Sequence, residues 1–221
     1  MLYASLAALA VMGVSLIGVI TTYHAVRDWV AHNLHFLVSL SAGLFVVVTY
    51  GLLQEASSTL PLQGILFWTL FGFGVVYTIS TFLPESHHHH TDDECCPEEP
   101  GPHAWRILAA DAIHNIGDGI ILLPAFLVSV PLGISVTIGI LIHEAIQEIS
   151  EFFILKRAGL TTGQALLQNF LVSSTILIGV IISIFLSTIE GIEPIVLSVA
   201  AGAFIFVIFK DLLPHSIGKA G

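Results

Sequence analysis

Long apolar runs alternate with short polar breaks along the whole chain. The runs are about 20 residues long, which is the length that an α-helix needs to cross the hydrocarbon core of a bilayer. They lack the strict alternation of apolar and polar residues that marks a membrane-spanning β-strand. Helix-stopping residues such as Pro61, Pro84 and Pro131 separate them. The pattern predicts an all-α polytopic membrane bundle of seven transmembrane helices, over residues 2–22, 34–54, 62–83, 104–128, 132–155, 164–187 and 193–213.

The basic residues test this helix count. If the chain crosses the membrane seven times, all six Lys and Arg residues fall on one side of it: Arg27, Arg106, Lys156, Arg157, Lys210 and Lys219. By the positive-inside rule that side is cytoplasmic, so we expect an N-terminus on the outside. A signal peptide would have basic residues before its apolar stretch, and the first run has none. We therefore interpret it as a retained helix.

Composition agrees with a membrane protein. The chain is 55% hydrophobic and 10% charged, whereas a soluble domain carries about 25% charged residues. This deficit excludes a soluble core and makes the lipid bilayer a partner of the chain. The basic residues are few and scattered, which argues against a nucleic-acid partner.

One segment, residues 85–103, is polar and rich in proline. It separates helices one to three (1–84) from helices four to seven (104–221) and is expected to be a cytoplasmic loop. It contains His87, His88, His89 and His90 next to several acidic residues. Imidazoles beside carboxylates suit weak capture of zinc-like ions. The alternative is a solvated linker with no binding role.

Ionisable side chains occur inside two neighbouring apolar runs, where each costs free energy unless it has a partner or a function. Residues three or four apart share a helix face, so each helix presents imidazole, amide and carboxylate groups together. Facing one another, the two sets could supply four to six nitrogen and oxygen ligands. The set suits zinc, iron(II), manganese or cadmium rather than copper(I), because it contains no sulfur. The residues are Asp111, His114, Asn115 and Asp118 in the fourth run and His143, Glu144, Gln147, Glu148 and Glu151 in the fifth.

Two alternative interpretations remain for the polar residues of the fourth and fifth runs. The residues could join helices by hydrogen bonds alone, although two histidines and several acids exceed what that role needs. His143-Glu144 also begins a metalloprotease-like motif, but the position of its second histidine is occupied by Gln147. An intramembrane protease is therefore disfavoured, and we do not expect an enzyme.

At these residues the chain resembles the ZIP (Zrt/Irt-like) family of divalent metal transporters. The matching stretches are HNIGDG (114–119), HEAIQEISEFFILKRAGLT (143–161), QNFLVSS (168–174) and AAGAFIFVIFKDLLPHS (200–216). The His-rich loop and the outside N-terminus are also typical of the family. The HE-x-x-QE form, with Gln147, resembles prokaryotic members, which implies a multi-pass protein of a prokaryotic inner membrane.

The resemblance implies a two-metal transport site between the fourth and fifth helices. Asp118 would be the bridging ligand, while Asp111 and Glu151 would lie on the metal pathway. Asp211 and His215 would lie near its cytoplasmic exit. The implied ligands are His114, Asn115, Asp118, His143, Glu144 and Gln147, with Glu148 as a further candidate.

Three departures from the family pattern stand out. Ile146 replaces the usual proline of the second motif, and the sixth run lacks the glutamate that some members use as a ligand. The family has eight helices, so we expect this chain either to be a fragment or to lack the last helix.

The leading hypothesis is transport of zinc, or of Fe²⁺, Mn²⁺ or Cd²⁺, toward the cytoplasm. The alternative is a metal-binding membrane sensor without flux. A homodimer is compatible with either.

Overall fold

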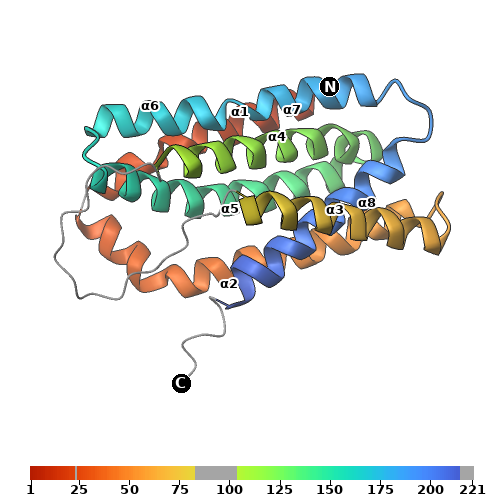
Figure 1. Cartoon of the computed structure of the whole chain (residues 1–221), viewed down its shortest axis with the longest axis horizontal. Helices are drawn as coiled ribbons and strands as arrows, with labels where there is room; N and C mark the ends of the chain where they lie inside the picture. The colour runs from red at the N-terminus through yellow and green to blue at the C-terminus, as the bar shows by residue number, and fades with distance from the viewer. Residues whose placement is uncertain (23, 83–103, 215–221) are drawn as a thin grey trace.

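The fold is a bundle of long helices that run roughly along one axis (Figure 1). The computed structural model describes residues 1–22, 24–82 and 104–214, and within these ranges all regular structure is helical. The elements are α1 (Leu2–Val14), the 3₁₀ segment η1 (Ser15–Thr22), α2 (His24–Ala56), α3 (Leu62–Phe82), α4 (Ala104–Val128), α5 (Val130–Arg157), α6 (Thr162–Ser173), α7 (Ile176–Leu186), α8 (Glu193–Val207) and the π-helical turn η2 (Ile208–Leu212).

Seven stretches of the described residues are long and apolar enough to cross a membrane, as the sequence predicted. Helix α2 differs from its prediction because it begins at His24, before the apolar run starts, and so extends past the apolar stretch. The first span differs as well, because it changes from α-helix to 3₁₀-helix at Ser15. These differences move element boundaries and leave the order of spans unchanged.

The predicted sixth span is confirmed over 162–186, but it is interrupted within its length. It consists of α6 and α7, which are separated by a turn at Ser174 and Thr175. The Thr175 hydroxyl donates to the carbonyl oxygen of Ala112 on α4 at 2.8 Å. Further along, the Ser183 hydroxyl donates to the carbonyl oxygen of Ile120 at 2.9 Å. Hydrogen bonds to a neighbouring helix therefore hold the interrupted span against α4, which apolar periodicity alone does not reveal.

Local sequence explains how α5 and α6 are bounded. Ser129 caps the start of α5 by accepting from the Leu132 amide at 3.2 Å. Lys156 and Arg157 occupy the last turn of α5, where basic side chains complement the helix dipole. Gly159 follows with a φ of +88°, a conformation that glycine adopts without steric cost. Thr161 and Gln164 then form a capping box that starts α6.

Two pairs of glycines bring helices into backbone contact. A Cβ atom on Gly119 of α4 would overlap the Ile176 carbonyl oxygen of α7, and one on Gly179 would overlap that of Ile116. Gly72 of α3 and Gly202 of α8 approach one another's helices in the same way. Small residues allow such close packing where lipid supplies no hydrophobic drive between helices.

Helices α4 and α5 lie in the middle of the bundle (Figure 1). Helices α1, α6 and α7 cover one side of them, and α2, α3 and α8 cover the other. Helix α3 is the most exposed span, with large apolar side chains such as Phe67, Leu70 and Phe71 directed outward. Polar side chains on α4 and α5 are therefore enclosed by protein on both sides.

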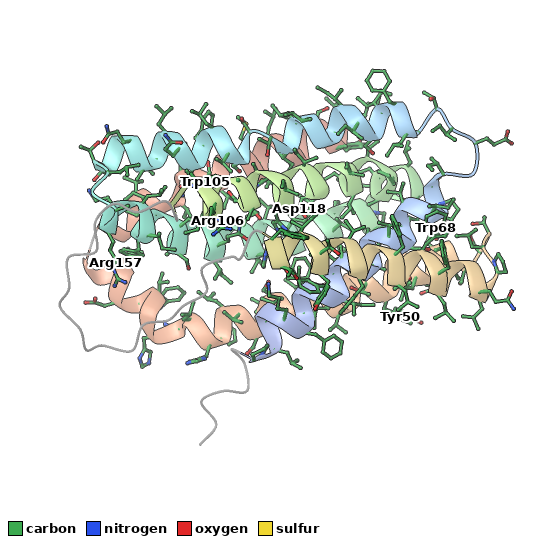
Figure 2. All side chains as sticks on the ribbon, viewed as in Figure 1. Tyr50, Trp68, Trp105, Arg106, Asp118 and Arg157 are labelled. Carbon is green, nitrogen blue, oxygen red and sulfur yellow. The ribbon has the colours of Figure 1, made fainter. Side chains whose placement is uncertain are left out.

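Two of the six basic residues lie toward the same end of the bundle. Arg106 and Arg157 lie toward one end of the long axis, while Tyr50 and Trp68 lie toward the other (Figure 2). Asp118 lies between the two groups along this axis. The position of Asp118 indicates that the ionisable residues of α4 and α5 lie well inside the membrane-spanning length of the bundle.

Candidate metal centre

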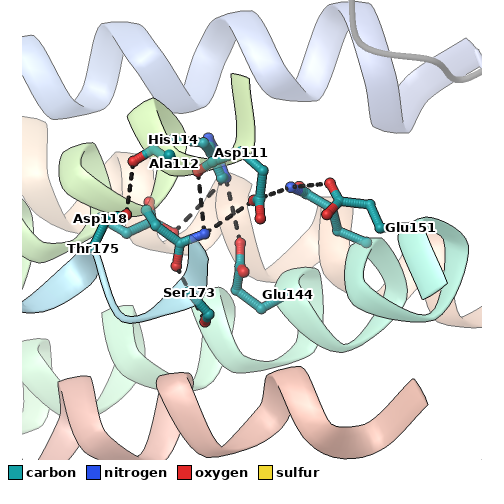
Figure 3. A network of polar contacts seen from close by, with 10 residues as sticks. Asp111, Ala112, His114, Asp118, Glu144, Glu151, Ser173 and Thr175 are labelled. Carbon is teal, nitrogen blue, oxygen red and sulfur yellow. Dashed lines mark hydrogen bonds and ion pairs between the residues drawn. The ribbon is translucent and has the colours of Figure 1, made fainter. Parts of the chain in front are cut away.

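Three side chains from α4 and α5 form a group of the size that holds a metal ion. They are His114, His143 and Glu144, whose candidate ligand atoms all lie within 4.8 Å of one another. His114 Nε2 lies 3.6 Å from Glu144 Oε1 and 3.8 Å from Asp118 Oδ2. Figure 3 shows the side chains of His114, Asp118 and Glu144 meeting between the two helices.

The distances suit zinc. Bonds of about 2.0–2.1 Å to nitrogen and oxygen place neighbouring ligands of a tetrahedral zinc ion about 3.4 Å apart. The two separations measured from His114 Nε2 exceed this value by only a few tenths of an ångström. Asp118 follows His114 by one helical turn, so both side chains project from the same face of α4. Two imidazoles and two carboxylates are a donor set that zinc accepts.

The centre is deeply buried. Glu144 has no exposed surface, and Asp118 and His143 are 3% and 8% exposed. Neither carboxylate oxygen of Glu144 has a hydrogen-bond partner among the described residues. Leaving an ionised carboxylate without compensation in a low-dielectric interior costs several kcal/mol, so its ionised form needs a positive charge beside it. A bound cation would supply that charge.

An aromatic wall closes the side of the centre that faces α2 and α8. The Phe45 ring on α2 lies 5.2 Å from the His143 imidazole, measured between ring centroids. Phe45 also stacks on Phe204 of α8 at 4.7 Å. Phe45 was not predicted from the sequence, because nothing in an apolar run distinguishes it from a lipid-facing phenylalanine.

The amide side chains of Asn115 and Gln147 both donate to the neighbouring carboxylate of Asp111. The Asn115 amide donates to Asp111 Oδ1 at 2.9 Å, and the Gln147 amide donates to the same oxygen at 2.5 Å. Gln147 also donates to Glu151 Oε1 at 3.2 Å. The amide nitrogens of both predicted ligands thus face carboxylates, and their role as metal ligands stays a prediction. Gln147 stands where a metalloprotease would have its second histidine, so the protease hypothesis gains no support here.

Helix α6 forms a third side of the site. Asn169 donates its amide to the Glu148 carbonyl oxygen at 3.2 Å. One turn later the Ser173 hydroxyl lies 3.5 Å from Asn115 Oδ1, to which it donates. Neither Asn169 nor Ser173 was predicted to have a role, although they lie four apart in the QNFLVSS stretch that contributed to the resemblance.

The remaining candidates lie in η2 or outside the described residues. Asp211 belongs to η2, which follows α8. His215 and the histidines of the loop, His87 to His90, lie outside the described residues. Their roles at the exit and in metal capture stay predictions.

Comparison with known proteins agrees with this geometry. A family model described as "ZIP Zinc transporter" matches residues 84–219, well over half of the chain. Human "Zinc transporter ZIP10" is 33% identical over 119 residues, which are 53% of this chain and 14% of that protein. Rat "Metal cation symporter ZIP8" is 35% identical over 118 residues, covering 53% and 25%. Fruit-fly "Zinc transporter foi" is 31% identical over 119 residues, covering 54% and 17%.

The chain thus spans a quarter or less of the length of these three relatives. The region matched by the family model, residues 84–219, nevertheless contains every residue of the buried centre. The chain belongs to the ZIP zinc transporter family.

Proposed function

We propose that the protein carries divalent metal ions, zinc foremost, across a membrane toward the cytoplasm. The observation that supports this most directly is the buried group of His114, His143 and Glu144, with Asp118 beside it. A buried imidazole–carboxylate site halfway along a membrane bundle is the arrangement expected of an ion pathway. The names of the relatives, zinc transporters and a metal cation symporter, point to the same activity.

The proposed ligands form two groups. His114, Asp118, His143 and Glu144 would hold the ion directly, since their donor atoms converge. Asn115, Gln147 and Glu148 would line the site and reach the ion as it moves. The donor set contains nitrogen and oxygen only, so Fe²⁺, Mn²⁺ and Cd²⁺ would compete with zinc.

The proposed mechanism is alternating access around this fixed site. The described spans enclose the centre on both sides, so the ion must enter and leave through a rearrangement of helices. The interrupted span formed by α6 and α7 packs on α4 through hydrogen bonds from Thr175 and Ser183, so we expect these helices to take part in the rearrangement. The end that carries Arg106 and Arg157 would face the cytoplasm.

Location and assembly are secondary proposals. We propose that this multi-pass protein lies in a prokaryotic inner membrane and pairs as a homodimer. The mass of the particle in detergent tests the pairing. A metal sensor without flux is the rival function, and it would bind zinc without moving it.

Zinc uptake into proteoliposomes tests the proposed function. Vesicles would contain the wild type, the double variant His114→Ala/Asp118→Ala, or the control His32→Ala, whose side chain is exposed on α2. We expect uptake by the wild type and the control and loss of uptake by the double variant. Equal uptake by all three would refute the site. Zinc binding by the wild type with no uptake would identify the sensor.

A further inference from the structure

Pro124 interrupts the backbone hydrogen bonding of α4 close to the metal centre. It lies inside the helix, six residues after Asp118. Proline has no backbone N–H, so the carbonyl oxygen four residues earlier, that of Ile120, lacks its usual intrahelical donor. Inside a bilayer little water is at hand to replace that donor, and a neighbouring helix or a hydroxyl group has to do so. The Ile120 carbonyl therefore needs a donor from outside the α4 backbone.

Ser183 of α7 supplies that donor. Its hydroxyl donates to the Ile120 carbonyl oxygen at 2.9 Å, and the residue has no exposed surface. Hydroxyl groups within helices usually donate to a carbonyl oxygen of their own preceding turn, as those of Thr137 and Ser198 do here. Ser183 instead bonds to another helix, at the carbonyl that Pro124 deprives of its N–H donor.

This hydrogen bond lies directly beside a candidate metal ligand. The Asp118 carboxylate is 3.8 Å from His114 Nε2. The next residue is Gly119, where a Cβ atom would overlap the α7 backbone, and Ile120 follows it. Three consecutive residues of α4 thus carry a candidate ligand, a close backbone contact with α7 and a hydrogen bond from α7. Helix α7 itself (176–186) has no ionisable side chain, so it can affect the ion only through its neighbours.

We propose that Ser183 is a positioning residue for the metal centre, because it compensates for the hydrogen bond that Pro124 removes from α4. Prolines are common causes of helix kinks, and a kink without a compensating partner leaves the helix free to bend. The Ser183 hydroxyl restricts this bend two residues after Asp118, and so holds the Asp118 carboxylate near His114 and Glu144. The inference rests on the proposed function, since it assumes that the ion binds at this centre.

Thr175 provides a matched comparison on the same interrupted span. Its hydroxyl also donates to α4, to the Ala112 carbonyl oxygen at 2.8 Å (Figure 3). The residue four positions after Ala112 is Ile116, which has a backbone N–H, so the Ala112 carbonyl keeps its helical donor without Thr175. Loss of the Thr175 hydroxyl therefore leaves no carbonyl of α4 without a donor, whereas loss of the Ser183 hydroxyl does.

A double-variant cycle on the full chain in detergent tests the assignment. The variants are Ser183→Ala, Pro124→Ala and the two combined, with zinc affinity measured by isothermal titration and Tm by thermal unfolding. Ser183→Ala should lower the Tm by about 2–10 °C, the shift expected when a buried acceptor loses its donor in a chain of this length. It should weaken zinc binding by up to about 10-fold, as expected for a residue that positions a ligand.

The Pro124→Ala background should abolish both effects. Alanine at position 124 supplies an N–H to the Ile120 carbonyl, so the combined variant should match Pro124→Ala alone in Tm and in zinc affinity. Equal effects of Ser183→Ala with and without Pro124 would overturn the proposal. A cycle that shows coupling in Tm while Ser183→Ala binds zinc as the wild type does would also overturn it, because Ser183 would then have a structural role only.

Further measurements cover the remaining outcomes. Thr175→Val removes a hydroxyl with little change of shape and should bind zinc as the wild type does. A loss of affinity as large as that of Ser183→Ala would show that the gap at Pro124 is not the cause. If Ser183→Ala does not fold, the combined variant should still fold and bind zinc, and its failure would contradict the proposal. Absence of zinc binding by the wild type would contradict the proposed function, and the Tm cycle would still decide whether Ser183 compensates for Pro124.

Discussion

His114 Nε2 on α4 and Glu144 Oε1 on α5 approach to 3.6 Å between the two central helices. The contact joins two residues that are 30 positions apart in the chain, and no hydrogen bond from another described residue reaches either Glu144 oxygen. The pair is therefore poised to share a cation. Several consequences can be measured.

Replacing Glu144 by glutamine should weaken zinc binding at least about 100-fold, because the loss of a direct ligand exceeds the 10–100-fold effect of losing an outer-shell partner. The uncharged side chain also no longer offsets the charge of the ion. Isothermal titration with zinc on the detergent-solubilised protein measures the change. His32→Ala should bind as the wild type does, and a Glu144→Gln affinity within twofold of the wild type would contradict the assignment.

Zinc binding should weaken as the pH falls. The metal needs neutral imidazoles and ionised carboxylates, so protons compete with it at every ligand. Histidine changes its charge within the range of pH 5 to 8, which places the effect in accessible conditions. Zinc titrations at pH 5.5 and 7.5 measure it. Affinity that stays constant or rises toward acid pH would argue against histidine ligation.

Phe45→Leu should lower zinc affinity by up to about 10-fold, which is the lower end of the range for positioning residues around a metal. The Phe45 ring packs on His143 and on Phe204, so a smaller side chain frees the imidazole to move. The matched control is Phe36→Leu, since Phe36 lies on the same helix with 66% of its surface exposed. Equal affinities for the two variants would show that the aromatic wall does not position His143.

Gly119→Ala should destabilise the protein by about 1–3 kcal/mol, the usual cost of overpacking. The new methyl group would overlap the Ile176 carbonyl oxygen, and α7 would have to move away from α4. Thermal unfolding in detergent gives the change in Tm.

Gly117→Ala is the control on the same helix, because a Cβ there meets no atom within 4 Å. Alanine has a higher helix propensity than glycine, so this variant should be as stable as the wild type or more stable. A lower Tm for Gly117→Ala than for Gly119→Ala would contradict the packing of α4 on α7.

The helical spans followed from the sequence because lipid imposes one requirement along the whole chain. Apolar length, prolines and basic residues identified seven spans and the ends of most of them. The sixth span was predicted, but the break inside it at Ser174 and Thr175 was not. Hydrogen bonds from Thr175 and Ser183 to another helix hold that interrupted span in place, and such partners are invisible in the run itself.

The sequence by itself determined which residue types enter the bilayer and at which one-turn spacing. That was enough to expect His114, Asp118, His143 and Glu144 near one another, because periodicity fixes the face of each helix. Only the tertiary structure decided which atoms converge. It turned Asn115 and Gln147 toward Asp111, brought Asn169 from α6 to Glu148 and placed Phe45 against His143. The physical reason is that the rotation and depth of packed helices depend on contacts between distant segments, which spacing within one helix does not encode.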